Sequence, residues 1–139
     1  MQNQTTSRQQ TFSLEQIKTA HAKVKSGADF PRYIRDIKLL GVLAYVTFVE
    51  DGHTEFRGEN NYLLSSPPRY SSLQIAHATD SEKFIKNLKE HQQGLTGYNA
   101  FCNLAASCGI AKWIVSLIDM TCIYYDSLGN QVLIEEIPG

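Results

Sequence analysis

The chain has 139 residues, a formal net charge of −1, 42% hydrophobic residues and 19% charged residues. A chain of this length fits one domain around one packed core, and the composition is typical of globular proteins and not of disordered ones. The near-neutral charge provides no general attraction to nucleic acid or to an anionic membrane, and no apolar run approaches the ~20 residues of a membrane-spanning helix.

The N-terminal segment is polar and contains no apolar signal-peptide core. We therefore expect residues 1–11 to form a disordered tail and residues 12–139 to form a single domain. The three cysteines, Cys102, Cys108 and Cys122, cannot all pair within one chain. Without a signal peptide, reduced thiols in a cytoplasmic protein are the expected state.

Two helices are predicted before residue 42. The first begins at a capping box of Ser13 and Gln16, carries apolar residues at helical spacing and ends at Gly27. The second begins at Asp29, which would serve as its cap, and ends at Gly41. Pro31 fits the first turn of this second helix, where its missing N–H leaves no hydrogen bond unmade.

The apolar spacing then changes to alternation, which predicts strands. Residues 42–50 and 53–57 are predicted to form a hairpin around the turn residues Asp51 and Gly52. Paired prolines at 67 and 68 indicate a loop, because they supply no hydrogen-bond donors to a sheet. Residues 71–77 are predicted as a third short strand.

The second half of the chain repeats this order. Thr79 and Glu82 are predicted to form a capping box for a helix that ends at Gly94. Thr96 is the expected cap of a following helix that ends at Gly109. Three further strands are predicted over residues 110–117, 121–125 and 131–137.

The predicted order is therefore ααβββααβββ. Runs of strands between runs of helices indicate an α+β fold, with an antiparallel sheet that carries its helices on one face. The repeated order suggests a duplication, although the residues of the two halves do not align well enough to establish it.

The sequence contains no complete motif for catalysis or for metal binding. The cysteines lack the C-x2–4-C spacing of zinc sites, so we expect no metal and no other cofactor. Glu135 and Glu136 are neighbours on a predicted strand and would point to opposite faces, so they cannot act as an acid–base pair. There is no phosphate-binding glycine loop and no serine nucleophile elbow. A non-enzyme is therefore the favoured interpretation.

One polar cluster is a candidate site, between the predicted helix of residues 96–108 and the sheet. It consists of His91, Gln92, Tyr98, Asn99, Cys102, Trp113 and Glu135. In an enzymatic interpretation, His91 would activate the Cys102 thiol as a nucleophile. In the structural alternative, Cys102 is a small buried residue and His91 interacts with the C-terminal dipole of its helix.

The C-terminal half also resembles a known family. Residues 91–102 (HQQGLTGYNAFC), 109–115 and 120–126 are similar to the YdfO-like family of uncharacterised bacterial and prophage proteins, some of which are labelled phage envelope proteins. The resemblance covers roughly residues 12–138 and implies a compact α+β fold of one domain. It implies no activity, cofactor or catalytic residue. Gly97 stands where family members often carry an acidic residue.

The leading hypothesis is a small, non-catalytic binding or accessory protein of the cytoplasm, related to phage proteins. Its partner would be an unknown protein or a second copy, because exposed strand edges commonly pair in homodimers. The alternative is a small-ligand-binding protein or enzyme that uses the polar cluster. A nucleic-acid interface is disfavoured, because the basic residues of the first helix form no dense stripe, and no membrane partner is expected.

Overall fold

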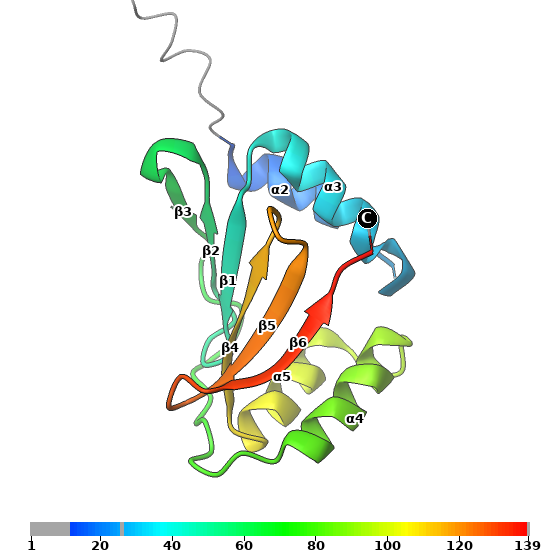
Figure 1. Ribbon diagram of the computed structural model, residues 1–139, viewed down its shortest axis with the longest axis vertical. Coiled ribbons are helices and arrows are strands. Elements are labelled where there is room, and N and C mark those ends of the chain that lie inside the picture. Colours follow the sequence, from blue (N-terminus) through cyan, green and yellow to red (C-terminus); the bar gives the residue numbers. More distant parts are fainter. Residues whose placement is uncertain (1–11, 26, 139) are drawn as a thin grey trace, which may run out of the picture.

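The computed structural model describes residues 12–25 and 27–138 (Figure 1). The predicted tail over residues 1–11 lies outside this part of the chain. The first half contains α2 (Leu14–His21), the 3-10 turn η1 (Gly27–Asp29), α3 (Phe30–Leu40), β1 (Ala44–Phe48), β2 (Thr54–Arg57), the 3-10 turn η2 (Glu59–Asn61) and β3 (Leu63–Ser65). The second half contains α4 (Ser81–Gln92), α5 (Tyr98–Ser107), β4 (Ile110–Ser116), β5 (Thr121–Asp126) and β6 (Gln131–Glu136).

The strands form one antiparallel sheet in the order β3-β2-β1-β4-β5-β6. The predicted α+β class is therefore confirmed. At the centre of the sheet β1 pairs with β4, with Val46 opposite Ile114. Each half of the chain thus supplies three neighbouring strands, and the two halves meet at the β1–β4 pair.

A single apolar core lies between the helices and one face of the sheet. Ile34 and Ile37 of α3 and Phe84 of α4 are fully buried there. The sheet contributes alternate residues of its strands, which are Tyr45, Phe56, Trp113, Val115, Cys122 and Tyr124. Each large apolar side chain that is fully buried contributes about 1.5–3 kcal/mol. Figure 1 shows α2 and α3 at one end of the sheet and α4 and α5 at the other.

The opposite face of the sheet carries an apolar row across its four central and C-terminal strands. Val46, Ile114, Ile123 and Ile134 are directly opposite one another on β1, β4, β5 and β6. None of the four belongs to the core cluster of the described residues, but Val46 is only 2% exposed, whereas Ile134 is 54% exposed. We call these four residues the open-face row.

The backbone of the second half repeats that of the first. Tyr98 begins α5 68 positions after Phe30 begins α3, and the left-handed Gly109 follows the left-handed Gly41 by the same interval. Met120, with a φ of 55°, likewise corresponds to Gly52 with a φ of 76°. Positive φ values are rare outside glycine, so their recurrence at one interval indicates a common backbone.

Side chains 68 positions apart occupy corresponding places in the two halves. Tyr33 corresponds to Phe101, Tyr45 to Trp113 and Phe56 to Tyr124, and all six residues are buried in the core. Because β1 and β4 are antiparallel neighbours at the centre, the halves are related by an approximate two-fold axis perpendicular to the sheet. We conclude that the domain is a tandem duplication of one ααβββ unit.

The predicted strand over residues 71–77 is wrong, because the third strand is the shorter β3 (Leu63–Ser65). Leu63 and Leu64 precede the paired prolines and pair with Arg57 and Phe56 of β2. Residues 71–77 instead run irregularly over the end of the sheet. Leu73 N donates to Glu50 O and Ala76 N donates to Ala106 O, so this segment bonds to a hairpin and a helix rather than to a strand.

Several predicted helix caps are also corrected. The capping box of Ser13 and Gln16 is confirmed, with both reciprocal hydrogen bonds present. Asp80 rather than Thr79 caps α4, because the Thr79 hydroxyl donates to Asp126 instead. Gly97 rather than Thr96 is the N-cap of α5. Asp29 precedes α3, but its carboxylate accepts a hydrogen bond from Lys25 N.

Candidate functional site

The seven residues of the predicted polar cluster lie in separate environments. The His91 ring stacks on Phe101 at 4.5 Å between centroids, and its Nδ1 lies 3.0 Å from Thr96 O. Phe101 in turn packs against Trp113 at 5.8 Å. His91 and Trp113 therefore belong to the aromatic core of the second half. Asn99 is exposed, and its carbonyl accepts a hydrogen bond from Asn103.

Gln92 and Glu135 form a second group with a tyrosine that the sequence did not indicate. Gln92 Nε2 donates to Glu135 Oε1 at 3.1 Å, and Tyr124 Oη donates to the same oxygen at 3.3 Å. Glu135 is opposite Cys122 on β5, and it therefore points to the helix-covered side of the sheet. The polar groups on this side of the sheet thus extend from α4 to the edge strand β6.

Tyr98 and Cys102 form the third group, together with three tyrosines from other parts of the chain. We call this group the tyrosine cluster, and its members are Tyr33 of α3, Tyr45 of β1, Tyr70 of the loop before α4, and Tyr98 and Cys102 of α5. The cluster spans both halves of the duplication, near the β1–β4 pair at which the halves meet.

The β1–β2 hairpin positions Tyr70. The Tyr70 hydroxyl donates to Val49 O at 2.6 Å. Its ring lies against Gly52, where a Cβ atom would come within 2.7 Å of the ring. Gly52 has a φ of 76°, so both the backbone conformation and the close approach require glycine. The turn residues predicted from the sequence thus also hold one wall of the tyrosine cluster.

The phenols of the cluster are neutral hydrogen-bonding groups at physiological pH. Burial raises the pKa of Tyr33, Tyr45 and Tyr98 above the ordinary value. The hydroxyls of Tyr33 and Tyr45 make no hydrogen bond with other described residues. Among those residues, Asn87 Nδ2 is the one fully enclosed side-chain polar atom without a hydrogen-bond partner. These two hydroxyl oxygens are therefore not fully enclosed, although the residues are only 6% and 7% exposed.

The thiol of Cys102 is not activated as a nucleophile. Burial raises its pKa, and this effect outweighs the hydrogen bonds with Tyr70 and Tyr98 that favour the thiolate. The residue is fully buried, and the ring nitrogen of His91 is engaged with Thr96. A protonated, buried thiol is inert, so the geometry favours the structural interpretation of Cys102. Burial likewise raises the pKa of Cys122, to about 12.

Arg69 supplies the positive charge beside the tyrosine cluster. Its guanidinium carbon lies 4.4 Å from the centroid of the Tyr98 ring, a cation–π contact. The Arg69 charge also lowers the pKa of Tyr33 and Cys102 relative to burial alone, so it lies near both groups. Neither of the two ion pairs within residues 12–25 and 27–138 involves Arg69.

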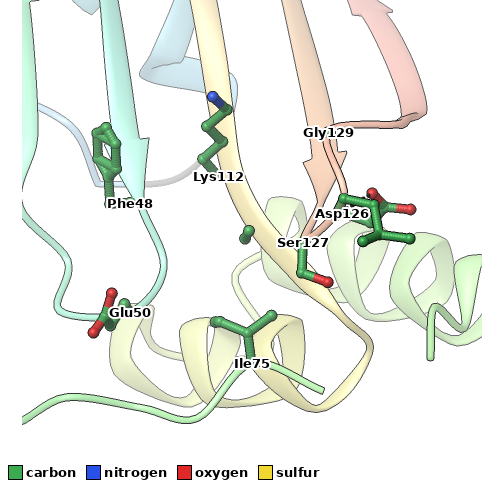
Figure 2. Close-up of a pocket in the computed structure, with 9 residues that line it drawn as sticks. Phe48, Glu50, Ile75, Lys112, Asp126, Ser127 and Gly129 are labelled. Carbon is green, nitrogen blue, oxygen red and sulfur yellow. Dashed lines mark hydrogen bonds between the residues drawn. The ribbon is translucent and has the colours of Figure 1, made fainter. Parts of the chain in front are cut away.

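A separate hollow of about 430 Å³ lies at the end of the sheet (Figure 2). Figure 2 shows Phe48 and Lys112 on two adjacent strands and Asp126 near the β5–β6 turn. The Asp126 carboxylate accepts hydrogen bonds from Leu128 N, Asn130 N and two side chains. This carboxylate therefore stabilises the turn. The second carboxylate of the lining, Glu50, is exposed and accepts a hydrogen bond from Ser72 Oγ at 3.0 Å.

Two classes of site are missing from the part of the chain that the structure describes. No group of three or more His, Cys, Asp or Glu side chains there could hold a metal ion. No helix there combines the length and the apolar character needed to cross a membrane.

Comparison with known proteins gives a family assignment. Residues 18–136 match the family described as "Protein of unknown function (DUF1398)". The chain belongs to this family. The search of curated proteins found no match. The DUF1398 family assignment covers both halves of the duplicated fold, while the resemblance to YdfO-like phage proteins stays a prediction.

Proposed function

We propose that this DUF1398 protein binds a small, ring-containing carboxylate at the tyrosine cluster and does not transform it. The proposal rests on Arg69, a cation without a carboxylate partner among the described residues, placed over the ring of Tyr98. A ligand carboxylate would pair with the guanidinium, which presents several N–H donors in a planar fork.

The phenols support the ring of the ligand. Tyr33 and Tyr45 are pre-positioned by burial, yet their hydroxyls have no partner in the described chain. Aromatic walls with a few converging polar groups are typical of small-molecule sites. A ring-containing ligand with a polar substituent would contact both the walls and the hydroxyls.

A binding role without catalysis fits the chemistry of the cluster. Its thiol and its phenols are all shifted toward their neutral forms, so none is a nucleophile or a base near neutral pH. The three cysteines are unpaired and buried. Free thiols fit a reducing compartment such as the cytoplasm, where we place the protein's action.

Titration of the chain with 4-hydroxyphenylacetate tests this proposal. Trp113 is the single tryptophan, and on β4 it lies two residues from Val115, which is opposite Tyr45 of the cluster, so its fluorescence reports on binding. We expect saturable binding that Arg69→Gln weakens about tenfold or more, the cost of losing a charge-assisted hydrogen bond. Arg35→Gln is the control, since Arg35 is an exposed cation of α3.

Two results would overturn the proposal. Absence of saturable binding at millimolar concentration would exclude ring-containing carboxylates as ligands. Equal affinity of the wild-type and Arg69→Gln proteins would show that the carboxylate binds somewhere other than the tyrosine cluster.

Self-association is a second candidate function, favoured by the open-face row. This row of β-branched side chains lies outside the core cluster of the described residues, and its most exposed member, Ile134, is on the edge strand β6. We propose that a second copy covers it, burying one row against the other about a two-fold axis. Sedimentation velocity should show a dimer that Ile134→Lys converts to monomer, whereas Leu39→Lys, on exposed α3 surface, should leave it unchanged. A monomer in the wild-type protein would exclude this candidate.

A further inference from the structure

The hollow at the end of the sheet brings together an aromatic ring and a cation (Figure 2). Phe48, at the end of β1, and Lys112, near the start of β4, are directly opposite each other in the strand register. Directly opposite residues have Cβ atoms about 4.5–5.5 Å apart, so both side chains can contact one small molecule. Both line the hollow of about 430 Å³, a volume typical of small-molecule sites.

The Phe48 ring is held in place by the β1–β2 hairpin. The His53 ring stacks on it in parallel, with 4.5 Å between the centroids and an interplanar angle of 2°. Asp51 Oδ1 in turn lies 2.6 Å from His53 Nδ1 and accepts a hydrogen bond from His53 N. Because His53 covers one face of the Phe48 ring, the opposite face is the one on which a flat ring in the hollow can stack.

Lys112 is the one cation of the lining. It belongs to neither of the two ion pairs of residues 12–25 and 27–138. Its Nζ lies 5.6 Å from the centroid of the Tyr125 ring, which is opposite on β5. A ring face attracts the ammonium but takes up none of its charge, so Lys112 can still donate hydrogen bonds to an anion.

The two carboxylates of the lining indicate what else the ligand carries. Asp126 is occupied by the donors of its own turn. Glu50 is exposed, and only its Oε2 is used by Ser72, so its other oxygen can accept a donor from a ligand. A bare anion would be repelled by these carboxylates, whereas a ring with N–H donors would hydrogen-bond to Glu50.

The duplication shows that the fold does not require a ring and a cation at this place. At the interval of 68 positions, Ser116 corresponds to Phe48. Ala44 likewise corresponds to Lys112. Ser116 and Ala44 are also directly opposite each other, at the other end of the β1–β4 pair. The same backbone pairing therefore forms with two small residues, so the Phe48 ring and the Lys112 charge are not a condition of the pairing.

The second hollow of the molecule provides an internal comparison. It has a volume of about 370 Å³ and lies between β2 and β3, where Gly58 corresponds to Asp126 of the first hollow. Its one cation, Arg57, already has a carboxylate partner, because its Nη2 lies 3.8 Å from Glu55 Oε1. Of the two hollows, the one beside Lys112 is thus the one that has a cation available for an anionic ligand.

We propose that the hollow beside Lys112 binds a nucleoside monophosphate. The base would stack on Phe48, its N–H donors would face Glu50, and the phosphate would accept hydrogen bonds from the Lys112 ammonium. The compact ammonium of lysine binds phosphate as a point charge, so a phosphate fits here as a planar carboxylate fits an arginine. This site is separate from the tyrosine cluster, and the inference does not rest on the proposed function.

Calorimetry with adenosine monophosphate, adenosine and inorganic phosphate tests the ring and the charge separately. We expect adenosine monophosphate to bind saturably, adenosine to bind about tenfold or more weakly, and phosphate alone to show no saturation at millimolar concentration. Lys112→Gln should weaken adenosine monophosphate about tenfold or more and change adenosine by less than about twofold. Phe48→Leu should weaken both ring-containing probes about fivefold or more, because the base loses its stacking partner.

Lys86→Gln is the matched control, since Lys86 is an exposed lysine of α4 and its loss should change no affinity. Lys112→Arg keeps the charge and should retain most of the affinity, which separates a loss of charge from a loss of structure. Equal affinities of adenosine monophosphate for the wild-type and Lys112→Gln proteins, or no saturable binding of this probe at millimolar concentration, would overturn the inference. Arg69-dependent binding of 4-hydroxyphenylacetate would then leave the proposed function standing.

Discussion

Substitution of Gly109 by alanine tests how tightly the second half is packed. Gly109 connects α5 to β4 with a φ of 84°, and a Cβ atom there would lie 2.6 Å from Ala78 O. The Ala78 carbonyl cannot easily withdraw. Ala76 N donates to Ala106 O on one side of it, and Asp80 N donates to Cys108 O on the other.

Two effects add up in Gly109→Ala. A left-handed conformation costs an alanine about 1–2 kcal/mol, and forcing an atom into a filled site costs about 1–3 kcal/mol more. We therefore expect the free energy of unfolding to fall by about 2–5 kcal/mol. Gly129→Ala separates these effects, because Gly129 has a φ of 86° and an open surrounding, so it should lose about 1–2 kcal/mol.

Urea unfolding followed by circular dichroism measures both variants against the wild-type protein. The difference between the two losses isolates the contact with Ala78 from the backbone conformation that both glycines share. Equal losses in Gly109→Ala and Gly129→Ala would refute the close approach between the α5–β4 junction and the segment before α4.

Two further predictions concern titrating groups. Cys102 and Cys122 are buried, and their pKa values are raised. Iodoacetamide at pH 8 should therefore modify both thiols far more slowly in the folded protein than in urea. Modification rates like those of the unfolded chain would contradict this burial. The pKa of Asp126 is lowered, mainly by the hydrogen bond from Asn130 N. The ionised Asp126 carboxylate therefore stabilises the fold above the unfolded pKa of 3.8, and this stabilisation is lost as the pH falls through the lower pKa of the folded state. Asp126→Asn should therefore destabilise the protein at pH 6 and reduce the loss of stability toward acid pH. The midpoints of urea unfolding between pH 2 and pH 6 measure both effects. If the variant loses stability toward acid pH as the wild-type protein does, Asp126 does not have this role.

The helices were the most predictable part of the fold, because their local signals agree with the tertiary structure. Ser13 and Gln16 form the capping box expected from their spacing, and Gly41 ends α3 in the left-handed conformation. The third strand was not predictable in the same way. Leu63–Ser65 is too short to show alternation, whereas residues 71–77 alternate because Leu73 and Ile75 pack against the core from an irregular segment.

The duplication was visible in the order of elements but not in the residues. Corresponding positions such as Tyr45 and Trp113, or Phe56 and Tyr124, conserve burial and aromatic character rather than identity. Packing selects for volume and apolar character at such positions, so sequence identity can be lost while the backbone is kept. The recurrence of positive φ values at Gly52 and Met120 required the structure.

The candidate site was predicted in part. Tyr98 and Cys102 do lie together, and Glu135 does bond to Gln92. Arg69 and Tyr70 were not predicted, because they belong to a loop whose path depends on contacts with the β1–β2 hairpin and α5. A contact between residues distant in the sequence has no periodic signal, so spacing alone could not reveal it.

Nuclear magnetic resonance of the chain with isotope-labelled tyrosine tests the central claim most directly. On addition of unlabelled 4-hydroxyphenylacetate, we expect the ring signals of Tyr33, Tyr45 and Tyr98 to shift. The signals of Tyr62, which donates to Phe12 O, and of Tyr125, on the other face of the sheet, should stay in place. Shifts confined to Tyr125, or no shift in any ring signal, would contradict a ligand site at the tyrosine cluster.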